Sequence, residues 1–369
     1  MSSEVLAGWR TTSLGSIIDF INGYAFKPED WRDAGTPIIR IQNLNGSDAF
    51  NYFDGNIPER YHVSAGDLLF CWSGSRGTSF GARKWTGPLG YLNQHIFRCE
   101  VSRDLDDGFA FFLLEGMTST IEAEAHGGGG LVHIKKSEIV KFDTLLPPLD
   151  EQRRIAEVLR SVDEAIAASQ AVSAATQGVF SQVRAKLMEA ARARSEEVVV
   201  ADAIAKNRGQ KLKKLQTSDY LDDGAFPIID QGAAFVCGFT DDETALWPYD
   251  LPVIVFGDHT RNLKFVEVPF VIGADGTQCI TPAAGFDARY LYYALQSLDL
   301  RGEGYARHFK LLKEKTIPMP TLIEQREIAE QLCSLEADVA AADTATERLI
   351  EVKQALMSDL LSGRVRVPA

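Results

Sequence analysis

Two long stretches of the chain carry apolar residues at the spacing of a single helix face. From Leu149 to Arg192 there is no proline and one glycine, Gly178. Apolar residues of this stretch fall at Ile155, Leu159, Val162, Ile166, Val172, Val179, Val183 and Leu187. Steps that are mostly three, four or seven predict one long amphipathic helix. Pro147 and Pro148 bar a helix from entering from upstream, and Asp150 and Glu151 suit a first turn.

The second stretch begins after Pro320, where Thr321 is a candidate N-cap, and continues to Gly363. Its apolar stripe consists of Ile328, Leu332, Leu335, Val339, Ala342, Leu349, Val352, Leu356 and Leu360. A helix of roughly 40 residues is about 60 Å long, and so narrow a stripe on so long a helix requires a partner. We therefore predict that the two helices pair as an antiparallel coiled coil. The middle of each stripe is small or polar, which would permit close approach there.

The same short motif opens both stretches. EQRRIAE begins at Glu151 and EQREIAE at Glu324, which places the two copies 173 residues apart in a chain of 369. An offset of almost half the chain indicates an internal duplication. The length allows two or three domains, each with its own core.

The segments that precede the helices read as mixed α/β. Short β-rich runs alternate with Gly, Pro and Asp turns, and the segments match loosely: TPIIR (36–40) parallels FPIID (226–230). The fold class we predict is α+β or mixed α/β, with two similar globular domains, two long helices and a pseudo-twofold relation. The predicted boundaries are 1–148 for the first domain, 149–195 for the first helix, 196–319 for the second domain and 320–369 for the second helix.

Composition narrows the environment and the class. The five cysteines are scattered without CxxC spacing, and no apolar run reaches membrane-spanning length, so we expect a cytoplasmic protein without disulfides or zinc. A net charge of −13 argues against a protein that coats nucleic acid indiscriminately, but it permits local basic loops. One such run, AKNRGQKLKKL, spans residues 205–215.

The repeated EQ(R)xIAE helices around two divergent α/β segments, together with the ending LLSGRVRV, resemble the specificity subunit of type I restriction–modification systems. The resemblance implies two target-recognition domains that each read half of a bipartite, asymmetric DNA site. It also implies that the helices set the spacing and bind two methyltransferase subunits, which motor-nuclease subunits then join. The chain itself would be non-catalytic, with S-adenosylmethionine, ATP and Mg²⁺ bound by its partners.

Candidate DNA contacts are polar residues in glycine-rich or basic loops after predicted strands. Ser and Thr suit phosphates, Arg suits guanine, and Asn and Gln suit adenine. In the first domain the candidates are Ser73, Ser75, Arg76, Thr78, Arg83, Lys84, Asn93, Gln94, His133, Lys135 and Lys136. In the second they are His259, Thr260, Arg261, Asn262, Lys264, Gln278, Arg307, His308 and Lys310. A glycine hinge at 127–130 precedes His133. Ordinary surface loops and core hydrogen bonds remain alternatives for all of them.

A second group of candidates would hold the helices or a partner. Its members are Gln152, Arg153, Ile155, Leu159, Val162, Ile166, Gln325, Arg326, Ile328, Leu332, Leu335 and Val339. The repeated Gln-Arg pairs anchor each helix either to the preceding domain or to the methyltransferase. A simple helix N-terminal cap is the alternative.

Motifs for catalysis do not stand out: there is no HExxH, GxSxG or GK[ST] sequence, and no methyltransferase glycine loop. A protein scaffold that holds two binding modules is the competing hypothesis for function. A stand-alone nuclease is a weaker third. Salt-sensitive DNA binding separates the first hypothesis from the scaffold, and metal-dependent cleavage by the chain alone would indicate the nuclease.

Overall fold

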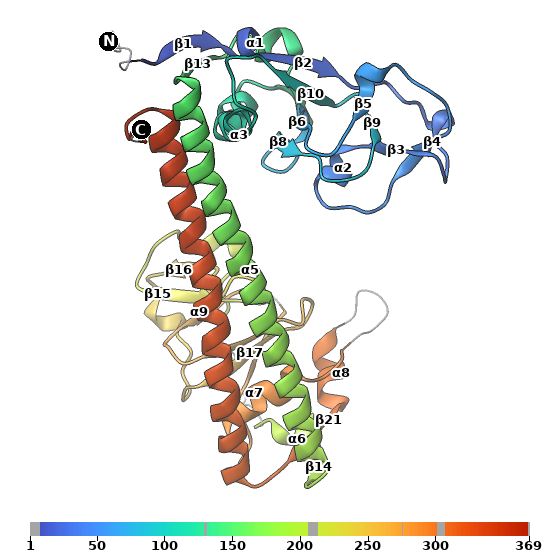
Figure 1. The fold of residues 1–369 in the computed structure, drawn as a ribbon. Helices are drawn as coiled ribbons and strands as arrows, with labels where there is room; N and C mark the ends of the chain where they lie inside the picture. Colours follow the sequence, from blue (N-terminus) through green and yellow to red (C-terminus); the bar gives the residue numbers. More distant parts are fainter. Residues whose placement is uncertain (1–7, 129–130, 206–212, 275, 301–306, 368–369) are drawn as a thin grey trace. The chain divides into compact units, whose positions relative to one another are not determined.

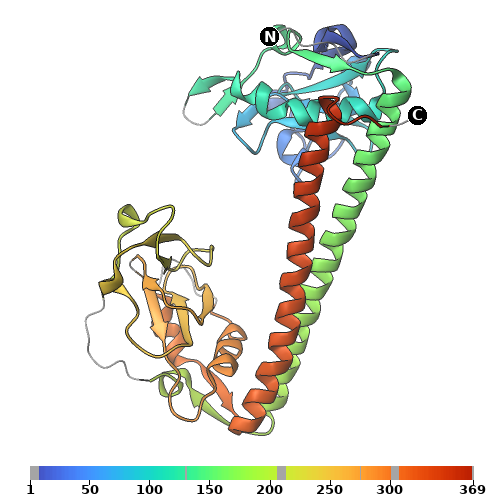
Figure 2. The same ribbon diagram turned by 90° about the vertical axis from the view of Figure 1, so that its left-hand side faces the viewer.

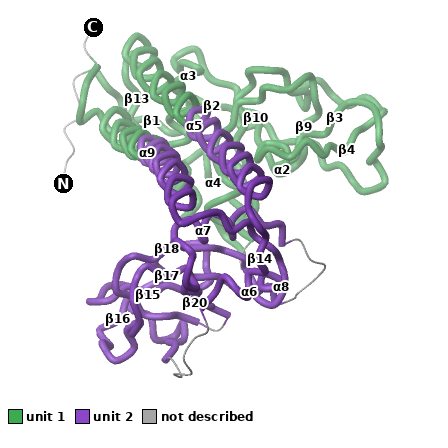
Figure 3. The backbone as a smooth tube through the Cα atoms, turned by 90° about the horizontal axis from the view of Figure 1, so that it is seen from below, with its two compact units in different colours: residues 1–169, 346–369 green, residues 170–345 purple. Residues whose placement is uncertain are grey.

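The structure is a computed structural model that describes the chain except for residues 1–7, 129–130, 206–212, 275, 301–306 and 368–369. It divides into two compact units, residues 1–169 with 346–369 and residues 170–345 (Figure 3). Each unit holds one globular head and one portion of each long helix. We describe each unit by itself.

The head of the first unit is built on three sheets and a strand pair. One sheet has the order β2 (Ile18–Asn22), β10 (Ile96–Val101), β6 (Leu68–Cys71), β8 (Gly81–Lys84). A second has the order β4 (Asn51–Phe53), β3 (Thr36–Ile39), β9 (Gly90–Leu92), β5 (His62–Val63). A third has the order β11 (His126–Gly128), β12 (Leu131–His133), β7 (Ser73–Ser75), and β1 (Arg10–Ser13) pairs with β13 (Asp143–Leu146).

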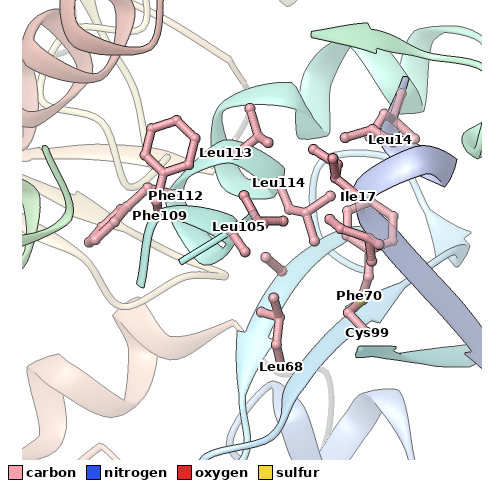
Figure 4. Packing of buried hydrophobic residues seen from close by; sticks show 14 of the residues in the cluster. Leu14, Ile17, Leu68, Phe70, Cys99, Leu105, Phe109, Phe112, Leu113 and Leu114 are labelled. Carbon is pink, nitrogen blue, oxygen red and sulfur yellow. The ribbon is translucent and has the colours of Figure 1, made fainter. Parts of the chain in front are cut away.

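Helix α3 (Asp107–Ala123) is the main helix of this head, and α1 (Leu14–Ile17), α2 (Ile41–Leu44) and α4 (Lys136–Ile139) are single turns. Asp106 caps α3 by accepting hydrogen bonds from the backbone N–H groups of Gly108 and Phe109. The core lies between α3 and the β2-β10-β6-β8 sheet, where Phe109 and Leu113 pack with Leu68 and Phe70 (Figure 4).

The head of the second unit repeats this plan with three-stranded sheets in place of the four-stranded ones. Its sheets have the orders β18 (Leu263–Val266), β17 (Val253–Gly257), β20 (Thr277–Ile280) and β16 (Gly238–Thr240), β15 (Phe226–Ile229), β19 (Val271–Ile272), and β14 (Glu196–Val199) pairs with β21 (Thr316–Met319). Its helices are α6 (Val200–Ala203), α7 (Ala288–Gln296) and α8 (His308–Glu314). Asp287 caps α7 as Asp106 caps α3.

Matching backbone hydrogen bonds show that the two heads share one architecture. In the first head, Trp72 N donates to His95 O and Ile134 N donates to Trp72 O, at 3.3 and 3.1 Å. In the second, Asp258 N donates to Gly276 O and His308 N donates to Asp258 O, at 2.8 and 2.9 Å. Each head also contains one parallel strand pair, β3 with β9 and β15 with β19. The predicted mixed α/β class and the predicted likeness of the heads are confirmed.

The long helices α5 (Leu149–Arg192) and α9 (Leu322–Leu361) lie within the predicted ranges 149–195 and 320–369, and they run side by side (Figures 1 and 2). In the first unit, Asp163 on α5 pairs with Lys353 on α9, and Ser169 pairs with Thr346. In the second unit, Ser173 hydrogen-bonds Asp343 further along. Each step forward on α5 is thus a step back on α9, which confirms the antiparallel coiled coil.

The seam of the coiled coil departs from the prediction at three valines. Val172, Val179 and Val352 are 59%, 50% and 48% exposed. The inward positions keep a strict three-four alternation through Ser169, Ser173, Thr176, Phe180 and Val183, and the two exposed α5 valines lie one residue off that register. At the register position beside Val352, Lys353 faces inward instead. The other predicted apolar residues of the seam (Ile155, Leu159, Val162, Ile166, Leu187, Ile328, Leu332, Leu335, Val339, Ala342, Leu349, Leu356, Leu360) are buried or half-buried.

Candidate nucleic-acid interface

In the first head, three predicted segments converge on one surface. Strand β7 pairs with β12 so that Ser73 lies opposite His133, and Leu131 at the β11–β12 turn is 64% exposed. The Trp72 N to His95 O bond brings the turn that holds Gln94 against β7. Gln94 Nε2 lies 3.3 Å from His95 Nε2. Ser73, Gln94 and His133, which are distant in the sequence, therefore form one polar group.

Two residues that the sequence did not single out complete this group. The His95 ring lies 5.5 Å from the Trp72 ring, and its pKa is lowered by burial and by the charges of Arg40 and His133. Arg40, at the end of β3, donates from Nη1 to Asn51 Oδ1 at 2.9 Å. The signal was present in the parallel of TPIIR with FPIID, because Arg40 and Asp230 are the residues that follow the matching strands.

Arg76 is not the freely exposed arginine that the sequence suggested. Its Nη1 donates to Glu122 O at 2.6 Å and its Nη2 donates to Ala125 O at 3.2 Å, while Gly77 N donates to Glu122 Oε1 at 2.7 Å. Arg76 thus ties the 75–79 turn to the end of α3. Ser75 and Thr78 are exposed on this turn. Arg76 is still exposed, and these two bonds use only part of the five N–H donors of its guanidinium group.

The remaining candidates of the first head lie elsewhere on its surface. Lys84 stands over the Phe111 ring at 5.7 Å, beside Arg83 on β8, and Lys136 pairs with Asp19 at 2.8 Å. Lys135 is exposed at the start of α4, and Asn93 is half-buried next to the parallel bridge with Tyr24. They do not join the group around Ser73, Gln94 and His133 through any contact among the described residues.

In the second head, the predicted residues gather around Gln231, which the sequence also failed to indicate. Its carbonyl oxygen accepts from Thr260 Oγ1 at 2.5 Å and from Asn262 Nδ2 at 3.1 Å, and its Oε1 accepts from His259 N at 3.3 Å. Between Thr260 and Asn262, Arg261 has a left-handed backbone with φ of 64°. Gln231 thus contacts His259, Thr260 and Asn262 of this turn, and backbone bonds within the turn add to its hold.

Two predicted DNA contacts of this head, Lys264 and His308, are each only 6% exposed, which leaves little of either residue for DNA to contact. Lys264 Nζ donates to Asp230 O at 2.8 Å and to Ala234 O at 2.5 Å, and its burial lowers its pKa. These bonds hold the 230–237 loop from inside. His308 is buried at the start of α8, where its backbone N–H donates to Asp258 O. Arg307 and Lys310 are exposed beside it, and Gln278 is half-buried on β20.

Some predicted features lie outside the described residues. They are residues 206–212 of the basic run, 129–130 of the glycine hinge, and 304–306 before Arg307.

The repeated glutamines join each helix to the head that precedes it. Gln152 Nε2 donates to Asp104 O and Pro147 O, and its Oε1 accepts from Asp106 N. Gln325 makes the same bonds with Gly285 O, Pro320 O and Asp287 N. Both side chains are fully buried. Of the predicted alternatives, anchoring to the head is confirmed for both glutamines, and direct contact with another protein is excluded for them.

The flanking residues differ between the copies. Thr321 and Glu324 form a capping box at the start of α9. Arg153 lies near Asp150 and Asp106, at 3.3 and 3.9 Å, and Arg326 is exposed. Glu151 is buried and accepts from Trp9 Nε1 at 3.0 Å and from Arg366 Nε at 2.6 Å. The Arg366 hydrogen bond holds the pKa of Glu151 below its ordinary value.

Metal sites and membrane-spanning helices would each indicate another class of function. No group of three or more His, Cys, Asp or Glu residues in the described ranges is arranged to hold a metal ion. None of the helices in the described part of the chain combines the length and hydropathy that a membrane span needs.

Comparison with known proteins points to one family. The model of the type I restriction modification DNA specificity domain matches residues 7–175. The specificity subunit of the type I restriction enzyme EcoBI from Escherichia coli is 35% identical over 157 residues, which are 41% of this chain and 31% of that protein. The MjaVIII specificity subunit from Methanocaldococcus jannaschii is 24% identical over 405 aligned positions, which cover 97% of this chain and 93% of that protein.

Solved structures extend the likeness of fold to nearly the whole chain. The S subunit of a type I restriction–modification system from M. genitalium has a TM-score of 0.60 at 18% identity and covers 98% of this chain and 97% of its own. A chain from a type I system, whose structure concerns complex assembly and conformational transition, has a TM-score of 0.55 at 17% identity and covers 97% and 98%.

Proposed function

Because this chain belongs to the family of type I restriction–modification specificity subunits, we propose that it reads a DNA sequence in two separated parts, one with each head. The observation that carries the proposal is that one backbone frame presents different side chains in the two heads. Trp72, Ser73 and His95 stand in the first head where Asp258, His259 and Gly276 stand in the second. Two frames of one design with unlike side chains suit a target with two unlike half-sites.

The chain would act as a non-catalytic adaptor in the cytoplasm. The coiled coil and the residues that flank the helix starts would bind two methyltransferase subunits, and motor-nuclease subunits would join through these. S-adenosylmethionine, ATP and Mg²⁺ would be bound by those partners. Family membership and the duplicated helix–head junctions at Gln152 and Gln325 support this assignment, since a repeated junction offers the same surroundings to two copies of one partner.

The test begins with the methylated positions in DNA from cells that express the whole system. We expect a motif of two defined parts separated by unspecified bases. A continuous motif would contradict the proposal. If the purified assembly failed to bind DNA at all, the protein-only scaffold would be favoured.

A matched pair of variants assigns the half-sites to the heads. Gln94→Ala in the first head and Gln278→Ala in the second each remove a half-buried amide. We expect each to reduce discrimination at one half-site, by about 1–3 kcal/mol if the amide bonds a base. Gln331→Ala, an exposed glutamine on α9, is the control and should change neither. Equal loss at both half-sites from either head variant would contradict the assignment.

A further inference from the structure

A groove in the second unit lies where the coiled coil meets the 257–262 turn. It has a volume of about 430 Å³ and is lined by Arg184 of α5, by Arg261 and Asn262 of the turn, by Gln296 at the end of α7 and by Asp299 after it, with leucines as its apolar wall. All of these residues belong to the second compact unit. The groove therefore combines a helix of the coil with the loop that carries the predicted DNA contacts.

Arg184 is half-buried, and few nearby groups of opposite charge offset the burial of its positive charge. Its Nη1 donates to the neutral Gln296 Oε1 at 2.7 Å, its guanidinium carbon lies 5.2 Å from the centre of the Phe180 ring, and it forms no ion pair with a described residue within 4 Å. Burial lowers its pKa, and the more distant Glu336 only partly opposes this. Arginine nevertheless stays charged in proteins, so an anion in the groove would be stabilised.

Arg261 reaches the same groove from a strained backbone. A left-handed conformation costs a residue other than glycine roughly 1–2 kcal/mol. The turn holds it there: Arg261 N donates to Gly257 O at 2.8 Å, and Gly257 N donates to Asn262 O at 2.9 Å. Glycine would adopt this φ without cost, so a long cationic side chain at a costly position indicates a functional requirement.

The first unit has a groove beside the same helix position, but that groove includes no residue of the matching 72–77 turn. It has about 420 Å³ and is lined by apolar residues such as Leu113, Met117 and Met357, together with polar residues that include Thr144 and Gln354. Met357 follows Arg184 by the repeat offset of 173 residues. An apolar side chain thus fills the same position in the other copy, and the arginine is particular to the second head.

We propose that Arg184 and Arg261 clamp one backbone phosphodiester of bound DNA. The groove presents two arginine side chains, and a guanidinium group bonds the oxygens of a phosphodiester well. This inference rests on the proposed function, and it adds a sequence-independent contact that brings the DNA backbone beside the coiled coil at the second head.

The test uses Arg184→Met, which copies the first unit, and Arg261→Gly, which suits the left-handed backbone. Both are made in the full chain, within the assembly purified from cells. Affinity for duplex DNA is measured by fluorescence anisotropy over a range of salt concentrations. We expect each variant to weaken binding to target and to unrelated duplex by the same factor, and to reduce the slope of log affinity against log salt by about 0.9, the value for one phosphate. The double variant should lose no more slope than either single variant, because both arginines hold one phosphate.

Lys186→Met, an exposed cation two residues along α5, is the matched control. Urea unfolding checks that each variant is folded. A methylphosphonate scan of the duplex should reveal one position at which neutralising the phosphate abolishes the difference between the parent and Arg184→Met.

If the parent binds its target but Arg184→Met keeps the parental affinity and slope, or if Lys186→Met lowers the slope equally, the clamp is wrong while the proposed function stands. Stabilisation of the parent chain by inorganic phosphate without DNA, lost in Arg184→Met, would identify a small-anion site and also overturn the clamp. Failure of the parent itself to bind DNA would refute the proposed function.

Discussion

Lys353 and Phe180 occupy the same position in the two copies of the long helix, 173 residues apart, and their side chains pack against the heads in opposite ways. Lys353 Nζ donates to both oxygens of Glu115, at 2.8 and 3.0 Å, and pairs with Asp163 at 2.8 Å, with its side chain 14% exposed. Phe180 packs against the Tyr293 ring at 6.1 Å. At this helix position the first head therefore meets the coil through charge, and the second through an aromatic ring.

Lys353→Met is expected to destabilise the chain. It leaves the carboxylates of Glu115 and Asp163 partly buried without their cation, which should cost about 3 kcal/mol, since removing one member of a buried ion network is expensive. Urea unfolding measures the loss. Adding Glu115→Gln and Asp163→Asn should recover most of it.

Arg348→Met, an exposed cation on the same helix, is the control for the Lys353 experiment and should change stability by less than about 0.5 kcal/mol. Equal effects of Lys353→Met and Arg348→Met would mean that the network contributes nothing.

Gln152→Ala and Gln325→Ala should destabilise their units similarly. Each removes a fully buried amide and leaves two backbone carbonyls and one N–H group without a partner, which should cost at least about 2 kcal/mol. Thermal unfolding with limited proteolysis shows which head loosens. Gln170→Ala, an exposed glutamine of α5, should be neutral. A neutral result for either buried glutamine would show that water replaces its bonds.

The corrected seam makes a direct prediction. Leu159→Asp and Leu332→Asp place a carboxylate at fully buried positions and should reduce stability by more than about 3 kcal/mol. Val172→Asp and Val352→Asp fall on exposed positions and should shift it by about 0.5 kcal/mol or less. Denaturant midpoints of the four variants decide the register. A large loss of stability from Val172→Asp would instead support the seam predicted from the sequence, in which Val172 faces the other helix.

Glu151 should make the chain sensitive to acid. Its folded pKa lies below the ordinary value because Arg366 and Trp9 donate to the ionised carboxylate. Its stabilisation is therefore complete above the ordinary carboxyl pKa and is lost as the pH falls through the lowered value. Unfolding free energy measured from neutral pH to about pH 3 should fall less steeply in Glu151→Gln than in the parent, although the variant starts lower. Parallel curves would mean that Glu151 does not titrate with folding. Glu324→Gln is a useful comparison, since the Glu324 pKa is lowered chiefly by hydrogen bonds from Thr321 of its own helix start.

Local chemistry was legible in the sequence. Pro148 and Pro320 prevent a helix from continuing in from upstream, and Gly363 follows the end of α9. Between these residues the apolar spacing fits only a helix, so the approximate bounds of α5 and α9 could be predicted. The inward-facing residues in the middle of the coiled coil could not be predicted, because Val172 is apolar whether or not it faces the other helix. Only the strict alternation through Ser173 and Phe180 distinguishes the inward positions.

Parts of the candidate site depended on long-range pairing. Ser73, Gln94 and His133 were identified as polar loop residues, but their meeting depends on strand pairs that no local pattern specifies. Lys264 was misjudged because basic residues are usually exposed. Here carbonyl oxygens of the 230–237 loop replace the water that it loses.

The side chains of Gln152 and Gln325 each hydrogen-bond backbone atoms only. Two of these atoms belong to the preceding head, and the third is the proline carbonyl oxygen at the start of the helix. This joint therefore does not depend on which side chains the head carries. A head exchanged at Pro147 or Pro320 would keep this joint, but its side-chain contacts with the long helices, such as Glu115 with Lys353 and Tyr293 with Phe180, would have to be matched anew.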